Sequence, residues 1–316
     1  MKKYIIKRLL IVIPVLFMIS VGAFMIVNLA PGNPVDLYVS PDMTTEQIEA
    51  TKQALGLNDP LTVQYAKWLM NILKGNLGFS FSSRLPVSTI LGQRIGPTLL
   101  LMSLSMVVAY SFAIPMGILS AKKQNSIVDY FVTGLSFTGI SLPSFFFGLG
   151  LIYVFAVKLK LLPTGGTKLL GVDGGIADQI RHLILPVIVL ASQFAANMIR
   201  YARSSMIEVY NENYIRTATA KGLKPMQILG NHGVRNALIP IITVIGADIP
   251  KIVGGAIVTE QIFQWPGIGS LMVASINSRD YPVLMAVTMI SAVAVLLANI
   301  LVDIMYAVVD PRIKFN

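Results

Sequence analysis

The sequence has 316 residues, 54% of them hydrophobic and 13% charged, which excludes intrinsic disorder and is atypical of a soluble domain. A formal net charge of +10 suits nucleic-acid binding, but membrane proteins also retain lysine and arginine on the cytoplasmic side, so we expect no nucleic-acid partner. The absence of cysteine excludes disulfides, thiolate catalysis and cysteine metal sites.

The chain begins with a basic segment that contains Lys2, Lys3, Lys7 and Arg8. A secretory signal peptide starts in the same way. The apolar run from Leu9 to Ala30 is longer than a typical signal core, however, and no small-x-small cleavage site stands out. We therefore interpret the run as a retained membrane span.

Six apolar runs approach the roughly 20 residues that a helix needs to cross a bilayer. They cover residues 9–29, 98–120, 136–157, 183–199, 237–258 and 283–305, although the third run could begin as early as Tyr130 and the fourth could extend upstream to about Ile180. Pro143 should break or kink the third run, because proline lacks the N–H that an interior helical position donates. The sequence therefore predicts an all-α integral membrane protein with six transmembrane helices surrounded by lipid.

The distribution of basic residues predicts the orientation. When each charge within a span is counted with the nearer side, the N-terminal side holds 14 Lys and Arg against 5 Asp and Glu, and the other side 11 against 10. The positive-inside rule then places both termini and residues 200–236 in the cytoplasm of a multi-pass cell-membrane protein.

We divide the chain into three parts. Residues 1–30 are the cytoplasmic N-terminus and the first span, residues 31–97 are an outer insertion, and residues 98–316 are a five-span core that contains the 200–236 loop.

The outer insertion carries the signals of two helices. Thr44 with Gln47 suits a capping box for a helix that runs to Leu55 before Gly56. Asp59 is expected to cap a second helix, which has Pro60 at its first position and ends before Gly75. The insertion is interpreted either as a solvated connection or as part of a docking surface for an extracytoplasmic partner.

The cytoplasmic loop also contains helical signals. Residues 214–221 contain no glycine or proline, and Gly222 follows where a helix C-terminal glycine is common. A second helical run is predicted from Met226 to Leu229, before Gly230. From pattern alone, this loop is either a docking element for a soluble partner or an ordinary solvated connection.

Two runs in this loop match a known pattern. YIRTATAKG, which ends at Gly222, and HGVRNALIP, which begins at His232, resemble the coupling loop of permease subunits of ATP-binding-cassette importers. The general motif is Glu-Ala-Ala, three residues, Gly, nine residues and Ile-x-Leu-Pro. Ala218 and Gly222 match this motif. Arg216 and Thr217 stand in place of its Glu and first Ala, and His232, Val234 and Arg235 stand in place of its Ile, Leu and Pro. These departures and the RNALIP sequence resemble the oligopeptide, dipeptide and nickel branch.

Seven further segments resemble the same branch in the same order. They are LAPGNP (29–34), GLNDPLTVQY (56–65), NLGFS (76–80), GISLPSF (139–145), EQIFQWPGIGSL (260–271), NSRDYPV (277–283) and DPRI (310–313). Each is weak by itself, but together they make the resemblance specific and extend it over nearly the whole chain.

The resemblance implies a type I importer permease fold and several partners. These are a homologous second permease, two cytoplasmic ATPase subunits that bind ATP and Mg²⁺, and an extracytoplasmic solute-binding protein. It also implies that the ATPases contact the coupling loop, for which the candidate residues are Tyr214, Arg216, Thr217, Ala218, Ala220, Lys221, Gly222, Arg235 and Asn236. The chain lacks Gly-x-x-x-x-Gly-Lys-Ser/Thr, so we expect no phosphate-binding loop, catalytic residue, metal site or cofactor of its own.

Two charges lie within the predicted fifth span. Asp248 and Lys251 are three residues apart, so they share one helical face. A charge at a helix centre costs about 2.5–3.5 kcal/mol on translocon scales, so both should face protein or water. They are either a structural ion pair or part of the translocation path. At the outer end, candidates for a gate or a binding-protein contact are Glu260, Phe263, Pro266, Gly267 and Gly269.

The sequence therefore predicts a permease subunit of an ATP-driven importer for di- or oligopeptides. The same architecture for nickel or metal–chelator complexes is one alternative. An ion-coupled secondary transporter is another, and it predicts intramembrane carboxylate or histidine relays and internal repeats. A membrane enzyme lacks a recognisable site, since the two histidines, His182 and His232, fall on opposite sides of the membrane.

Overall fold

The computed structural model describes residues 2–29, 44–54, 56, 58–168 and 174–309, and this part of the chain is helical with no β-strand. Five of its helices are long and apolar enough to cross a membrane. The spans lie within α1 (Lys2–Leu29), α4 (Val87–Lys122), α7 (Gly175–Tyr210), η3 (Ile228–Val234) with α10 (Arg235–Gly254), and α13 (Tyr281–Val309). The all-α membrane fold is therefore as predicted.

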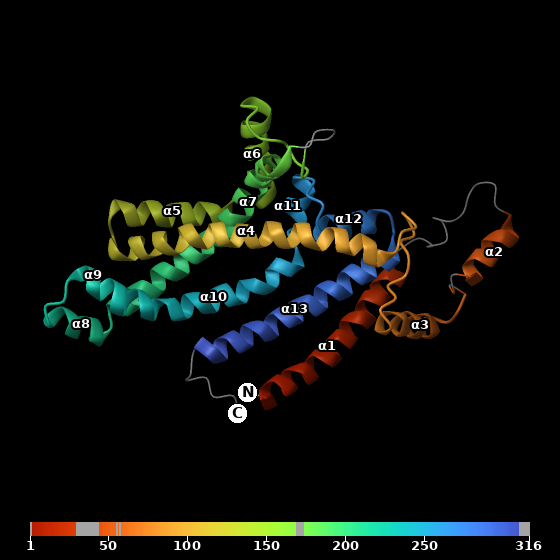
Figure 1. Cartoon of the computed structure of the whole chain (residues 1–316), viewed down its shortest axis with the longest axis horizontal. Coiled ribbons are helices and arrows are strands. Elements are labelled where there is room, and N and C mark those ends of the chain that lie inside the picture. The colour runs from red at the N-terminus through yellow and green to blue at the C-terminus, as the bar shows by residue number, and fades with distance from the viewer. Residues whose placement is uncertain (1, 30–43, 55, 57, 169–173, 310–316) are drawn as a thin grey trace.

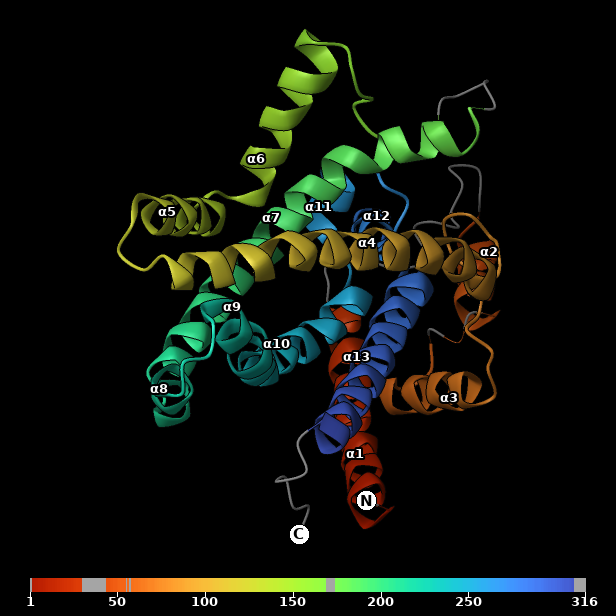
Figure 2. The ribbon, with the colours of Figure 1, turned by 60° about the vertical axis from the view of Figure 1, so that its left-hand side comes forward.

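The sixth predicted span is a broken helix. It comprises α5 (Ile127–Ser141), then α6 (Ser144–Leu151) with its π-helical continuation η2 (Ile152–Lys158), and the two parts meet at 102° (Figure 2). Leu142 is extended, with φ −77° and ψ 120°, as expected for a residue before proline. The predicted break at Pro143 is confirmed, but the helical segment starts at Ile127, well before residue 136.

Two other helices extend beyond the predicted spans. α4 starts at Val87, so residues 87–97 are helical and not part of a separate loop. α7 continues to Tyr210, so the first residues of the 200–236 loop belong to the same helix. At 1.5 Å per residue, a 36-residue helix is about 54 Å long and exceeds the roughly 30 Å hydrocarbon core. An apolar window detects the lipid-crossing part of such a helix and misses its polar ends.

The outer insertion contains α2 (Thr45–Ala54) and α3 (Leu61–Leu73). The capping box is confirmed, because the Thr44 N–H donates to Gln47 Oε1 at 3.0 Å and the Gln47 N–H to Thr44 Oγ1 at 3.4 Å. The predicted cap by Asp59 is wrong: α3 has no side-chain cap, and the Asp59 carboxylate instead accepts from Lys67 Nζ at 2.6 Å. Leu55 lies outside the described residues.

α4 and α7 form the centre of the fold and run side by side in the same direction (Figures 1 and 2). Three hydrophobic clusters follow one another along the pair, and each contains residues of both helices: Met102 of α4 with Leu190 of α7, Ala113 with Ala202, and Ala121 with Met206. A Cβ on Gly117 would lie 2.6 Å from Ala202 Cβ, so the two backbones approach too closely for a larger residue. The pair forms a continuous packed unit.

α1 and α13 pack together beside this pair (Figure 1). Arg8 and Asp303 form an ion pair of 3.1 Å between them, at the ends of these helices where both chain termini lie. The remaining helices are α8 (Asn213–Ala220), α9 (Pro225–Gln227), α11 (Ile257–Ile262) and α12 (Ile268–Asn277). α8 and α9 lie at one end of the molecule, and α2 and α3 lie at the other (Figure 1).

Candidate coupling site and translocation path

The loop of residues 200–236 contains a short helix at the predicted place. α8 runs from Asn213 to Ala220, within one residue of the predicted bounds, and Gly222 follows with a φ of +78°. The second predicted run does not end at Gly230. Instead, α9, η3 and α10 follow one another without a break, and the backbone at Gly230 does not adopt the positive φ that ends a helix.

α8 has one buried face. Ile215 and Ala218 are three residues apart and pack into a cluster with the ends of α4, α7, η3 and α10. The other buried members of this cluster are Ala121, Met206, Val209, Ile228 and Ala237. α8 is thus seated directly on the ends of α4 and α7 and on the segment that leads into α10.

The opposite face of α8 is exposed and carries most of the predicted coupling residues. These are Tyr214, Arg216, Thr217 and Ala220, followed by Lys221 and Gly222. Arg235 and Asn236 are also exposed at the start of α10. Ala218 differs, because its side chain is buried in the seat and cannot contact a soluble partner in this structure. Its small size suits the packing of α8 against its seat.

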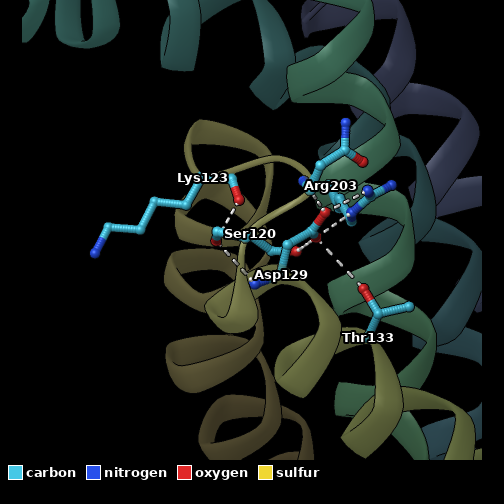
Figure 3. Close-up of polar contacts among 7 residues, drawn as sticks. Ser120, Lys123, Asp129, Thr133 and Arg203 are labelled. Carbon is cyan, nitrogen blue, oxygen red and sulfur yellow. Dashed lines mark hydrogen bonds and ion pairs between the residues drawn. The ribbon is translucent and has the colours of Figure 1, made fainter.

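A buried ion pair that we did not predict lies close to this seat. Asp129, in the first turn of α5, is bound by the Arg203 guanidinium of α7 through two hydrogen bonds (Figure 3). Arg203 Nε lies 2.7 Å from Oδ1 and Nη2 lies 2.8 Å from Oδ2. Two parallel bonds of this kind are the strongest arrangement for an arginine and a carboxylate. The pair therefore fixes α5 against α7.

Asp129 also accepts hydrogen bonds from neighbouring groups. The Ser120 hydroxyl of α4 donates to Oδ1, and the Asn125 N–H donates to Oδ2 at 2.9 Å. Ser126 caps α5 by accepting from the Asp129 N–H at 3.4 Å. Asp129 thus joins α4, α5 and α7 one turn from the α8 seat. The Ser126-x-x-Asp129 pattern resembles a capping box and could have marked Asp129, whereas nothing local marks Arg203 as its partner.

The two charges of the fifth span are paired. Lys251 Nζ lies 2.5 Å from Asp248 Oδ1, and the Tyr110 hydroxyl of α4 donates to Asp248 Oδ2 at 2.5 Å. Asp248 is buried, but the Lys251 side chain is 60% exposed. Sequence reasoning missed Tyr110, because residues 138 positions apart share no local pattern. Whether the pair lines a path stays a prediction.

Glu260 lies in a compact outer lid, which we define as residues 257–277. Its carboxylate is fully buried and accepts from Thr98 Oγ1 of α4 and from the Ser270 N–H, each at 2.8 Å. Thr98 Oγ1 in turn accepts from the Ile268 N–H at 2.8 Å. Trp265 Nε1 donates to the Pro97 carbonyl at 2.9 Å. These bonds attach the lid to the outer part of α4.

The lid differs from the predicted gate in two respects. The fifth span ends at Gly254, followed by Gly255 with a φ of +74°, so Glu260 belongs to the separate helix α11. Glu260, Phe263, Gly267 and Gly269 are buried and Pro266 is partly buried, so none offers a fully exposed contact for a binding protein. A gating role for these residues stays a prediction.

Comparison with known proteins assigns the chain to a family. Residues 113–315 match the family model of the binding-protein-dependent transport system inner membrane component, and residues 1–105 match the model of its N-terminal region. The chain belongs to this family. It is therefore a multi-pass inner membrane permease of a binding-protein-dependent importer.

Relatives of this permease align over their whole length. It is 48% identical over 316 residues to the oligopeptide transport system permease protein AppB of Bacillus subtilis (strain 168), with full coverage of both chains. It is 40% identical over 316 residues to the glutathione transport system permease protein GsiC of Escherichia coli (strain K12), again with full coverage.

A solved structure has the same fold. It is an inward-facing form of the MetNI methionine ABC transporter, which is 16% identical, with a TM-score of 0.58 over 71% of this chain and 97% of the other. At this level of identity, the match establishes the fold alone.

Two of the sequence motifs of the permease meet in space. Asp280 of NSRDYPV is buried and accepts hydrogen bonds from the Ser80 hydroxyl at the end of NLGFS and from the Phe81 N–H, the latter at 3.0 Å. The start of α13 is thereby held against the segment that leads into α4. A structural role in the outer half of the permease accounts for the acidic residue in this motif.

Gly222 provides a test of the coupling role that the sequence predicts for α8. We expect Gly222→Val to lower ATP-dependent uptake about tenfold while the permease still reaches the membrane, because a left-handed backbone costs an L-residue about 1–2 kcal/mol. A Cβ at this position meets nothing within 4 Å, so backbone strain alone produces the effect. Gly230→Val is the matched control, because Gly230 also has open space but no positive φ. Normal uptake by Gly222→Val would leave the loop as a simple connection.

Proposed function

We propose that this permease forms one half of the transmembrane path of an ATP-driven importer for di- and oligopeptides. The observation that carries the proposal is the full-length match to an oligopeptide permease, combined with a coupling helix whose polar face is exposed and whose apolar face is seated on the spans. The name of GsiC adds a small peptide, glutathione, to the substrates of its relatives.

The proposed assembly has four kinds of subunit. A homologous second permease completes the path, two cytoplasmic ATPases bind ATP and Mg²⁺ and contact α8, and an extracytoplasmic binding protein delivers the peptide. Closure of the ATPases around ATP displaces α8, which moves α4 and α7 through the shared seat. The path then opens outward to receive the peptide, and hydrolysis returns it to the inward-open state.

The proposed orientation places both termini and α8 in the cytoplasm, and α2 and α3 outside. Single cysteines can test this cleanly because the chain has none. We expect a cysteine at exposed Gln53 to react with an impermeant maleimide added outside intact cells, and one at exposed Lys224 to react only after the membrane is opened. The reversed pattern would contradict the proposed orientation and the assignment of α8 to the ATPases.

Reconstitution tests the function. Proteoliposomes that contain both permeases and both ATPases are supplied with the binding protein and a radiolabelled dipeptide or pentapeptide. We expect uptake that requires ATP and is unaffected by an uncoupler. Uptake of Ni²⁺ or a nickel chelate without peptide uptake would favour the metal branch, and loss of uptake with an uncoupler would favour an ion-coupled transporter.

A further inference from the structure

The Asp248–Lys251 pair lies in the last two turns of α10, with Lys251 in the last turn. Tyr110, which donates to Asp248, is 12 residues before Lys122 at the end of α4. This separation is about 18 Å along the helix axis. Tyr110 belongs to the core cluster in which α4 packs against α7 and α10. The pair is therefore well separated from the cytoplasmic end of the helix, where charges reach water easily.

The two charges differ in what they can still bind. Both oxygens of Asp248 are engaged, one by Lys251 and the other by Tyr110, and the residue is buried. Lys251 is largely exposed, and an ammonium group has three donors, one of which is directed at Asp248. The exposed Lys251 ammonium can therefore donate hydrogen bonds to a ligand, whereas the buried Asp248 carboxylate is not accessible as an acceptor.

Lys251 belongs to an exposed stripe of small and polar residues along α10. The exposed residues from the second position of this helix onward are three or four apart, which places them on one face: Asn236, Pro240, Thr243, Ala247, Lys251 and Gly254. Among the described side chains of α10, no large apolar one is exposed. By contrast, α1 exposes Leu10, Ile13, Phe17 and Met18.

This contrast separates two kinds of surface. The α1 face has the composition of a surface that meets lipid, where a lysine is costly. The α10 stripe carries Asn236, Thr243 and Lys251 among small residues and, among its described side chains, no large apolar one, so it lacks the composition of a lipid-facing surface. Lys251 therefore faces an aqueous route or a polar occupant, and the occupant that its remaining donors fit is an anion.

We infer that Lys251 is a subsite for a carboxylate of the transported peptide, an inference that rests on the proposed function. Every free peptide carries a C-terminal carboxylate, so the subsite is independent of the amino-acid side chains. An ammonium–carboxylate contact is a charge-assisted hydrogen bond. Asp248 partly neutralises the ammonium, which keeps the contact weak enough for release, as conduction through a path requires.

The inference predicts a loss that is specific to the peptide terminus. In proteoliposomes containing the complete importer, uptake of labelled trialanine is compared with uptake of its C-terminal amide. We expect Lys251→Gln to lower the ratio of acid to amide uptake about tenfold, because the charge-assisted bond is lost only for the acid. Lys251→Arg should retain the wild-type ratio. The same binding protein serves every variant, so its own preference cancels in the comparison.

The matched control is Lys52→Gln. Lys52 pairs with Glu49 at the same i,i+3 spacing and a similar distance, 2.6 Å, but it lies in the outer insertion. We expect its ratio to equal that of the wild type. An unchanged ratio in Lys251→Gln, with ATP-driven uptake intact, would overturn the subsite. An equal fall for acid and amide, with less second permease copurifying, would assign Lys251 to a subunit interface instead. Absence of peptide uptake by the wild type would contradict the proposed function itself.

Discussion

Asp129→Asn should destabilise the permease by about 3 kcal/mol, because removal of one partner leaves a guanidinium poorly compensated within the fold. This value is at the low end for a buried pair, since 26% of the Arg203 side chain is exposed. The measurement is the thermal midpoint of the detergent-purified protein, together with its abundance in the membrane. Ser120→Ala should have a smaller effect, because it removes one neutral donor to the same carboxylate.

The matched control is Asp303→Asn. It breaks another arginine–aspartate pair, Arg8–Asp303, but 44% of Arg8 and 20% of Asp303 are exposed there. Because this pair is more exposed than Asp129–Arg203, its loss should cost less free energy and lower the thermal midpoint less. Equal destabilisation by Asp129→Asn and Asp303→Asn would contradict the central structural role that we assign to Asp129.

Gly267→Val should disrupt the outer lid and abolish uptake. A Cβ at this position would lie 2.3 Å from Glu260 Cδ and Oε1, and the carboxylate cannot move away without losing its bonds to Thr98 and Ser270. The φ of −100° suits any residue, so the whole effect is steric. Overpacking of a buried site typically costs about 1–3 kcal/mol, and we expect the upper end here. Thermal unfolding and uptake are the two measurements.

Gly96→Ala is the control for this prediction, because Gly96 lies in α4 with nothing within 4 Å of its Cβ. We expect normal uptake from it. The double variant Gly267→Ala with Glu260→Asp tests the cause, because a shorter carboxylate makes room for the added methyl group. Its thermal midpoint should exceed that of Gly267→Ala alone. Tolerance of Gly267→Val would mean that Glu260 does not hold the lid in place.

The local features of this permease could be predicted from its sequence. The end of α8 just before Gly222, the break at Pro143 and the Thr44 capping box each depend on a few adjacent residues whose backbone preferences or side-chain donors act locally. The family-specific segments predicted the fold, because they occur in order along the whole chain.

The contacts between helices could not be predicted in the same way. Asp129 and Arg203 are 74 positions apart, and Tyr110 and Asp248 are 138 apart, so no local pattern joins either pair. The sequence predicts Glu260 at the outer end of the fifth span, because the apolar run stops at residue 258. Its burial follows from Thr98, which is 162 positions away and supplies a donor from another helix.

The packing of α4 against α7 has a thermodynamic consequence. Ala121 of α4 belongs to the seat of α8, and Thr98 holds the lid 23 residues away, about 35 Å along the same helix. α7 packs along this length and supports α4 on both sides of Pro115, so we expect a shift at one end to be carried to the other. Linkage then makes the effect reciprocal. A binding protein that displaces the lid should change the affinity of the ATPases for α8, and ATPase binding should change the affinity for the binding protein by the same factor.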